Sequence, residues 1–273
     1  MFAHLSLRSC LHITGEDAAG FLQGLISNDI RKAGQGALIY AAMLSPQGKF
    51  LHDFFITAHE GGFLVDIDGA RAADFKKRLM LYRLRSKVEI GALPHQVVAG
   101  WGGEPTPPHV LAFSDPRLPL LGWRSYEPSV APASAHEADY HKHRIGLGVP
   151  DGAQDLLAEK SFLLEWGIDQ LHGVDYQKGC YVGQEVTART HYRGQVKKAP
   201  HIVTADRSLP AAGAIIYCGE KEAGELRSSS GSQGLALLRL EEVSAAAASG
   251  MPLRAGDVVL STRLPDWFTL ADK

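Results

Sequence analysis

A thiol lies among a lysine and two glycines in residues 177–185, which read QKGCYVGQE. The following residues, 186–192, have a helical pattern, so we expect Cys180 in the turn that leads into a helix N-terminus. Unpaired N–H groups and the positive end of the helix dipole favour a thiolate there, and Lys178 adds positive potential. Such surroundings can make a cysteine a nucleophile or a metal ligand. The alternative is a buried cysteine in a glycine-rich turn, which composition alone favours.

The composition is that of an ordinary globular protein, with 45% hydrophobic and 21% charged residues over 273 positions, a length that suits two or three domains. The formal net charge of −2 gives no overall nucleic-acid signature, so an RNA-binding surface would have to be local. The three cysteines form no C-x-x-C pair, and the twelve histidines show no strong chelating spacing. We therefore expect no disulfide framework and no intrinsic metal site, with Cys10 and Cys218 as packing residues.

The N-terminal residues 1–6 lack the basic and apolar layout of a signal peptide. No apolar run approaches the roughly eighteen residues that a membrane span needs. We therefore expect a cytoplasmic protein without a membrane partner.

Strands and helices are expected to alternate before residue 195 without a regular βαβ period, which is typical of an α+β fold. Apolar alternation predicts strands, and apolar spacings of three and four predict helices. The strands are expected over 2–13, 37–44, 50–57, 62–67 and from 87 to 90. The helices are expected from an N-cap at Thr14 to about 27, over 70–82 with Tyr82 on the core face, over 136–145 and over 186–192.

Beyond residue 195 the pattern changes to short apolar runs separated by glycine turns, which is typical of a small antiparallel barrel or sandwich. These runs are 201–204, 213–218, 223–227, 234–240 and 257–262. We place a domain boundary near Gly194, with the barrel domain over 195–273. The region 1–194 is expected to hold two lobes, roughly 1–95 with 136–194, and 96–135 packed between.

Five stretches together resemble the YgfZ family, whose members are relatives of the glycine-cleavage T-protein, an aminomethyltransferase. The signature is KGCYVGQE at 178–185. The other stretches match in order and spacing: FLQG at 21–24 with Asn28-Asp29, SPQGK at 45–49, YRLRSKV at 82–88, and Arg144 followed by GVP at 148–150. The match covers residues 2–195 and extends more weakly into the C-terminal region.

The resemblance implies a T-protein-like α+β fold: a ring of two mixed lobes and a C-terminal antiparallel β-barrel, around a hole that binds tetrahydrofolate or a related folate. It also implies a role in the assembly or repair of iron–sulfur clusters in client enzymes and, through them, in tRNA modification. The implied partners are iron–sulfur cluster carrier proteins and client enzymes, with a transient shared cluster. A nucleic acid is the less favoured partner.

The resemblance assigns residues to the folate. Glu165 matches the position where T-protein-like sequences carry an acid that binds pterin, and a pterin suits a carboxylate that accepts from its N–H groups. The alternative is a carboxylate at the rim of the core, paired with an arginine. Tyr140 matches an aromatic position and would stack on the ligand, unless it is a core tyrosine. Asn28, Gln184 and Lys178 complete the cofactor-binding set.

A local basic cluster surrounds Tyr192, and its members are Arg189, Arg193, Lys197 and Lys198. Such a cluster can hold the glutamate tail of a folate or an RNA backbone, or it can form a solvated surface. Arg189 is the member that we assign to the ligand, because on a helix it lies four residues beyond Glu185.

The T-protein relies on an acidic pair in the hairpin after its glycine turn, where residues 51–54 read LHDF and keep only Asp53. The signature instead supplies Cys180, which T-proteins lack at that point. Both departures weigh against aminomethyl transfer and favour a non-enzymatic maturation factor with Cys180 as the functional thiol. Because clusters typically take four ligands, a single thiol implies a partner protein. A folate-dependent one-carbon transferase is the first alternative, and a tRNA-binding module is the second.

Overall fold

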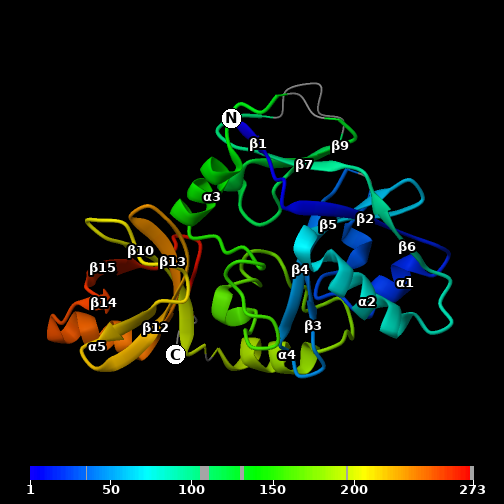
Figure 1. The fold of residues 1–273 in the computed structure, drawn as a ribbon. Coiled ribbons are helices and arrows are strands. Elements are labelled where there is room, and N and C mark those ends of the chain that lie inside the picture. Colours follow the sequence, from blue (N-terminus) through cyan, green and yellow to red (C-terminus); the bar gives the residue numbers. More distant parts are fainter. Residues whose placement is uncertain (35, 105–110, 130–131, 195, 271–273) are drawn as a thin grey trace. The chain divides into compact units, whose positions relative to one another are not determined.

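The computed structural model of the chain describes residues 1–34, 36–104, 111–129, 132–194 and 196–270 (Figure 1). The chain forms two compact units. The first consists of Met1–Tyr140 and Leu171–Val186, and the second of His141–Gln170 and Thr187–Lys273. Within the described ranges, each helix is too short or too polar to span a bilayer.

A five-stranded antiparallel sheet forms the centre of the first unit, in the order β3-β4-β5-β2-β6. Its strands are β2 (Arg8–Thr14), β3 (Ile39–Leu44), β4 (Phe50–His59), β5 (Gly62–Asp68) and β6 (Glu89–Leu93). β3 and β4 form the hairpin expected around residues 45–49, and β5 follows directly. The strands expected over 37–44, 50–57 and 62–67 and from residue 87 are therefore confirmed. The single strand expected over 2–13 is wrong, because a turn closed by the bond from Arg8 N–H to the Leu5 carbonyl divides it into two strands that belong to different sheets.

One face of this sheet carries the apolar core of the first unit. Successive side chains of a strand point to opposite faces, so Phe54 and Ile56 of β4 lie in this core while Phe55 lies on the other face. Phe75 and Leu79 pack in the same core from α2. The helices of this region are α1 (Ala18–Gln23), α2 (Ala72–Arg83), and the 3₁₀ helices η1 (Ile30–Lys32) and η2 (Gly69–Arg71).

A four-stranded antiparallel sheet in the order β1-β7-β9-β8 completes the first unit. Its strands are β1 (Phe2–His4), β7 (Gln96–Gly100), β8 (Ala112–Ser114) and β9 (Trp123–Glu127); the 3₁₀ helix η3 (Pro119–Leu121) lies between β8 and β9, and α3 (Glu137–Gly146) follows.

A buried ion network links the two sheets of the first unit. Asp66 of β5 is fully buried and pairs with Arg8 of β2 at 2.6 Å and with Arg124 of β9 at 2.7 Å. The guanidinium carbon of Arg124 lies 3.9 Å from the centroid of the Phe55 ring. Because a desolvated carboxylate is stable only when it is paired and hydrogen-bonded, Asp66 and its arginines hold the sheets together.

The first helix is shorter than expected. Thr14 pairs with Glu89 in the ladder between β2 and β6, so it cannot serve as the N-cap, and α1 begins after Asp17 instead. Gly24 ends the helix, and Ile26 forms an isolated bridge with Met43. The expectation of a helix from Thr14 to 27 is therefore wrong at both ends, because strand pairing takes the residues that local sequence assigned to the helix.

The helix expected over 70–82 is confirmed as α2, but the placement of Tyr82 on the core face is wrong. Phe75 and Leu79 are fully buried, whereas Tyr82 is 40% exposed. α2 ends one residue later at Arg83, so Tyr82 lies in the last turn, beyond the part of the helix that packs on the core.

The second unit contains a closed antiparallel barrel in the order β10-β13-β12-β11-β14-β15, with β15 paired back to β10. Its strands are β10 (Lys198–Thr204), β11 (Ile215–Cys218), β12 (Lys221–Ser230), β13 (Gln233–Arg239), β14 (Leu253–Ala255) and β15 (Val258–Arg263), with α5 (Leu240–Ser249) between β13 and β14. The five apolar runs expected after residue 195 all fall on strands of this barrel.

Residues 141–170 belong to the same compact unit as the barrel, whereas the sequence placed the boundary near Gly194. This segment holds the 3₁₀ helix η4 (Leu164–Trp166), and α4 (Gln184–Arg193) follows it along the chain. Gly167 (φ +62) explains part of the grouping, because a Cβ there would lie 2.7 Å from both Trp267 and Phe268. The C-terminal residues therefore pack tightly against this segment. The division of 1–194 into lobes stays a prediction.

We expect Asp66→Asn to destabilise the first unit by about 3–5 kcal/mol, the usual cost of leaving a buried charge without its partner. Arg8 and Arg124 would keep their charges in a site that excludes water. Hydrogen exchange in increasing guanidinium, followed separately for peptides of each unit, measures the effect. Asp206→Asn is the control, since Asp206 has an 89% exposed side chain on the barrel unit. Equal protection of β5 and β9 in both variants would contradict the role of the network.

Candidate functional site

The loop that carries Cys180 is tied to the turn after α1 by Lys178. The Lys178 ammonium is buried and donates to the carbonyl oxygens of Gln23 at 2.6 Å and Ile26 at 2.5 Å. A second hydrogen bond joins the same two residues, because Gln23 Nε2 donates to the Lys178 carbonyl at 3.1 Å. The backbone of Val182 adds a further contact, N–H to the Gly24 carbonyl at 3.1 Å.

The titration of Lys178 reflects this environment. Burial lowers the pKa of Lys178 to about 8, while the carboxylates of Asp29 and Asp175 oppose the shift. The two carbonyl acceptors also favour the charged form, so the ammonium donates to both at pH 7. The positive charge of Lys178 therefore strengthens the two hydrogen bonds that anchor the loop. The Lys178 Nζ also lies 4.8 Å from the centroid of the Tyr181 ring.

Asn28 and Ser27 tie down the start of the same loop. Asn28 is buried, and its Nδ2 donates to the carbonyls of Tyr40 and His172, each at 2.8 Å. The Ser27 hydroxyl donates to the Gly173 carbonyl at 2.5 Å and accepts from the N–H of Ala42 at 2.8 Å. These bonds join β3, the turn after α1 and the loop 171–183 into one hydrogen-bonded cluster.

Two glycines let the signature pack against the hairpin turn at 45–49. Gly183 has φ +83, and a Cβ there would lie 2.3 Å from the Ser45 carbonyl oxygen. Gly48 has φ +73, and a Cβ there would lie 2.9 Å from the Cβ of Val186. Both positions therefore require glycine for backbone conformation and for space.

Cys180 is exposed at the tip of this anchored loop. α4 begins at Gln184, four residues later, so the thiol precedes the helix without belonging to its first turn. The Gln184 Oε1 accepts from the N–H of Tyr181 at 3.0 Å, which orders the residues between the thiol and the helix. A thiol that is accessible and held on a fixed loop suits metal ligation or thiol exchange.

The structure brings only some of the expected site residues close to Cys180. Asn28, Lys178 and Gln184 come together with Cys180 in the first unit, where the contacts above position the loop. A ligand role for these three stays a prediction. The remaining members, Tyr140, Glu165 and Arg189, lie elsewhere.

Tyr140 lies in the buried network of the first unit. It is 2% exposed, and its hydroxyl accepts from Arg117 Nη2 at 3.0 Å. The Trp101 ring lies 5.9 Å away between centroids. This placement agrees with the alternative of a core tyrosine, because a ring that stacks on a ligand needs an open face.

Glu165 and Arg189 both lie in the second unit. Glu165 is half-buried on η4 and lines a cavity of about 230 Å³ together with Lys160 and Lys198. Arg189 is exposed on α4, as is Tyr192, which is 77% exposed. The same cavity is also lined by Asp155, Glu222, Glu225 and Arg227, so acids and cations line it together.

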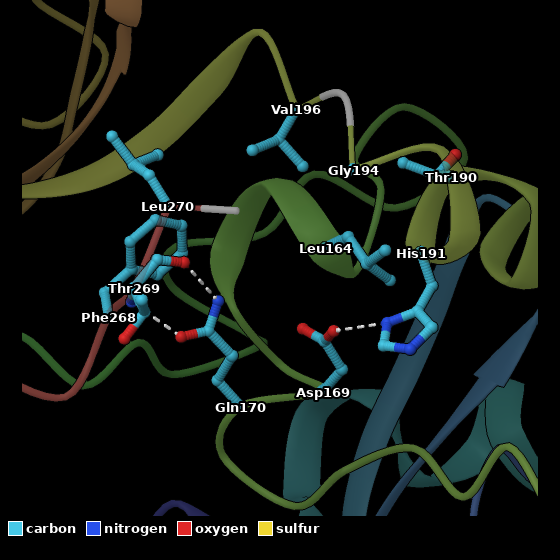
Figure 2. A pocket seen from close by; sticks show the side chains of 10 residues that line it. All are labelled: Leu164, Asp169, Gln170, Thr190, His191, Gly194, Val196, Phe268, Thr269 and Leu270. Atoms are coloured by element: carbon cyan, nitrogen blue, oxygen red, sulfur yellow. Dashed lines mark hydrogen bonds and ion pairs between the residues drawn. The ribbon is translucent and has the colours of Figure 1, made fainter. Parts of the chain in front are cut away.

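A larger cavity of about 370 Å³ lies in the same unit (Figure 2). Its lining includes Leu164 and Thr190, the sequence neighbours of Glu165 and Arg189. Asp169 and His191 face each other across one side of it, with 3.6 Å between Asp169 Oδ2 and His191 Nδ1. Gln170 closes another side through two bonds to the backbone of Thr269, at 2.9 and 2.7 Å. The apolar walls are Leu164, Val196, Phe268 and Leu270.

This cavity combines apolar walls with a carboxylate and an imidazole, a lining that suits a flat heteroaromatic ring bearing N–H donors. Asp169 and His191 were missed from the sequence. They are separated by 22 positions and face the same cavity only after folding. The sequence around Asp169 gives no local signal that would have singled it out.

The described residues bear on the expected metal sites and on the two cysteines outside the signature. Across these ranges no group of three or more His, Cys, Asp or Glu side chains is arranged to hold a metal ion. Cys10 and Cys218 are both buried, as expected for packing residues, and burial raises the pKa of the Cys10 thiol.

Known relatives match most of the chain. The human iron–sulfur cluster assembly factor IBA57, mitochondrial, is 31% identical over 97% of this chain and 85% of its own length. The mouse protein of that name is 29% identical over the same shares. The Mycosarcoma maydis homolog is 36% identical over 70% of this chain and 54% of its own length.

The fold has a known counterpart. The crystal structure of the glycine cleavage system aminomethyltransferase T from Bartonella henselae superposes with a TM-score of 0.76 over 98% of this chain and 86% of that chain. At 14% identity this likeness shows the fold alone. Residues 197–270 match the family model described as the CAF17 C-terminal beta-barrel domain. The T-protein-like α+β fold with a C-terminal antiparallel barrel is therefore confirmed.

The same relatives correct one expectation. All three are named as mitochondrial proteins. This finding contradicts the cytoplasmic location expected from the sequence and points to the mitochondrion instead. That expectation is wrong.

We expect Lys178→Met to loosen the loop that carries Cys180. The carbonyls of Gln23 and Ile26 would lose their donor, and a buried acceptor left unsatisfied costs about 1–3 kcal/mol. Hydrogen-exchange mass spectrometry should show amides of residues 173–182 exchanging at least about tenfold faster, a factor that corresponds to about 1.4 kcal/mol. The barrel strands should be unchanged.

Lys32→Met is the matched control for this prediction. Lys32 pairs with Asp175 of the same loop at 2.7 Å, but its side chain is 61% exposed. An exposed pair contributes only about 0–1 kcal/mol. Equal loosening in both variants would contradict the anchoring role of Lys178.

Proposed function

Because the chain belongs to the family of the iron–sulfur cluster assembly factor IBA57, we propose that it helps to assemble or repair iron–sulfur clusters on other proteins. The observation that carries this proposal is Cys180, an exposed thiol on a loop that buried contacts hold in place. The relatives compared above do not carry the YgfZ name, so that finer identification stays a prediction.

The thiol can contribute one ligand to a cluster that is the cargo of the protein. Its thiolate would form one Fe–S bond, and a cluster typically takes four protein ligands. No metal-binding group of three or more His, Cys, Asp or Glu was found among the described residues, so a partner would supply the other ligands. Iron–sulfur carrier proteins and client enzymes are the partners that could supply the remaining cluster ligands. tRNA modification would depend on the chain only through such clients.

We further propose that the chain binds tetrahydrofolate or a related folate. The fold is that of an aminomethyltransferase, and the second unit offers two acids beside cavities, Glu165 and Asp169. The residues fit a folate in part: either carboxylate could accept from the pterin N–H groups. The cations Lys160 and Lys198 near Glu165 share their cavity with further acids, so they suit an anionic tail less well. Tyr140 does not fit the stacking role, because it is buried in the first unit.

Aminomethyl transfer is the less favoured activity. In the hairpin where T-proteins carry their acidic pair, Asp53 is 6% exposed and accepts from the Tyr40 hydroxyl at 2.8 Å. His52 is 1% exposed, and its Nε2 lies 2.9 Å from Asp74 Oδ2. Burial, and then the nearby Arg71, lower the pKa of His52 to about 4, so it is neutral at pH 7. Both residues are engaged within the first unit, which supports a non-enzymatic role.

We expect Cys180→Ser to abolish the cluster-assembly function while the fold stays intact, because the side chain is exposed. In cells that depend on this chain, radioactive iron incorporated into immunoprecipitated iron–sulfur enzymes should fall at least about fivefold, because the thiolate is the ligand that serine does not replace. Gln177→Ser is the control, since this exposed residue of the same loop makes its loop contact through its backbone N–H. Wild-type iron incorporation in the Cys180→Ser cells would refute the role of the thiol.

Calorimetric titration with tetrahydrofolate tests the folate proposal and locates the site. We expect binding that Glu165→Gln weakens at least about tenfold, because a lost bond to a charged acceptor costs about 1.5–3 kcal/mol. Asp169→Asn should leave that affinity unchanged. The reverse pattern would move the ligand to the cavity of Figure 2. Wild-type protein that shows no binding would contradict the folate proposal altogether.

A further inference from the structure

The last turn of α2 and the residue after it expose four large apolar side chains within five positions. Met80 is 42% exposed, Leu81 68%, Tyr82 40% and Leu84 89%. Isolated apolar residues are normal on a protein surface, but a cluster of this kind marks an interaction site. Lys76 and Met80, and Lys77 and Leu81, lie four positions apart within α2 and so are neighbours along the helix, whereas Leu84 and Arg85 follow its last residue, Arg83.

This surface is also strongly basic. Residues 71–87 contain seven Lys or Arg and one Asp, a net charge of +6, although the whole chain has a formal charge of −2. Part of this charge is paired: Arg78 binds Asp74 at 2.7 Å and Lys87 binds Glu16 at 2.7 Å. The outward members Lys76, Lys77 and Arg85 are exposed. We call the set Lys76, Lys77, Met80, Leu81, Leu84 and Arg85 the α2 surface.

The backbone at Leu84 is held in an unfavourable conformation. Its φ is 44° and its ψ is −109°, a region that residues with a Cβ rarely adopt. The side chain is almost fully exposed, so packing within the chain does not offset this strain. Strained positions of this kind concentrate at functional sites, and here the strain turns an apolar side chain toward solvent beside Arg85.

An open hollow of about 870 Å³ adjoins the α2 surface. Leu84, Arg85 and Ser86 line one side of it, and α1 lines the other with Gly20 and Phe21. The remaining lining residues are the acids Glu16 and Asp17. The hollow therefore combines two apolar side chains with charges of both signs at its rim.

The hollow and the Cys180 loop share α1. Phe21 lines the hollow, and two residues later Gln23 binds Lys178, while Gly24 binds the loop at Val182. A standard interface buries about 800 Å² on each partner, a patch roughly 30 Å across. Both features belong to the first unit, so a folded partner of that size could reach the thiol without involving the second unit.

We propose that the α2 surface and its hollow are the docking site for the protein that supplies the other cluster ligands, and that this partner presents an acidic surface with an apolar side chain at its centre. This inference rests on the function proposed above and adds the place and the chemistry of recognition. The acidic residues of the partner meet Lys76, Lys77 and Arg85, and its apolar side chain enters the hollow between Phe21 and Leu84.

Charge decides against the other occupants. A second copy of this chain placed symmetrically on this surface would bring the exposed cations Lys76, Lys77 and Arg85 against their own copies, which is repulsive. An anionic membrane would approach the carboxylates of Glu16 and Asp17 as well as the cations, and a flat bilayer does not fill a hollow. A folded protein with complementary charges of both signs can pair with the cations of the α2 surface and with the acids of the hollow.

The test uses the full chain and a purified iron–sulfur cluster carrier protein of the same cell with net negative charge at pH 7. Calorimetry should show binding that weakens with added salt. Leu84→Asp and Arg85→Glu should each raise the dissociation constant at least about tenfold, as expected for central interface residues. Leu7→Asp and Lys142→Glu are matched controls at exposed positions that belong neither to the α2 surface nor to the hollow, and they should bind as wild type does. Circular dichroism checks that each variant is folded.

Other outcomes would overturn the proposal. These are no binding of the carrier by the wild-type chain, equal loss in the controls, binding that charge reversal leaves unchanged, or capture by phosphatidylserine vesicles in place of the carrier. Iron incorporation in cells separates the two hypotheses. A loss with Cys180→Ser and none with Leu84→Asp or Arg85→Glu would leave the function standing and refute the docking site, whereas no loss with Cys180→Ser would refute the function itself.

Discussion

The position of the Cys180 thiol depends on the buried ammonium of Lys178. Residues 171–183 form no regular secondary structure, so the loop has no ladder of its own to hold it. Its anchor is a pair of hydrogen bonds to carbonyls more than 150 positions earlier in the chain. Asn28 and Ser27 repeat this arrangement at the start of the loop. Long-range contacts of this kind give the thiol a fixed place while leaving it exposed, which local structure alone could not do.

The signature residues therefore have different duties, although they are adjacent in sequence. Lys178 and Gly183 face inward: the first neutralises carbonyl dipoles, and the second allows the backbone to touch the hairpin turn at 45–49. Cys180 alone faces outward with a reactive group. Within the first unit, the contacts of these signature residues hold the loop that exposes the thiol. The glycine turn at Gly48 belongs to the same support, since it packs against Val186.

Local pattern was enough to predict much of the fold. The hairpin of β3 and β4, the helix α2 and the barrel strands follow from alternation and spacing that the surrounding structure does not override. The prediction failed at Thr14 and Tyr82, where strand pairing and the end of the helix decide the outcome. The site shows the same limit. The exposed turn around Cys180 was predictable, but the burial of Lys178 and the meeting of Asp169 with His191 arise from contacts between distant segments.

A single thiol binds a cluster weakly when it acts alone, because one Fe–S bond must compete with solvent and other thiols. A second contact changes this balance, since docking makes the next contact intramolecular, at an effective concentration in the millimolar range for a short connection. The α2 surface can supply that contact without adding ligands to the cluster. Moderate affinity suits such a factor, because a cluster bound to one exposed thiolate must also leave. A salt-sensitive interface of basic and apolar side chains associates rapidly and releases readily, whereas a deeply buried one would retain the cargo.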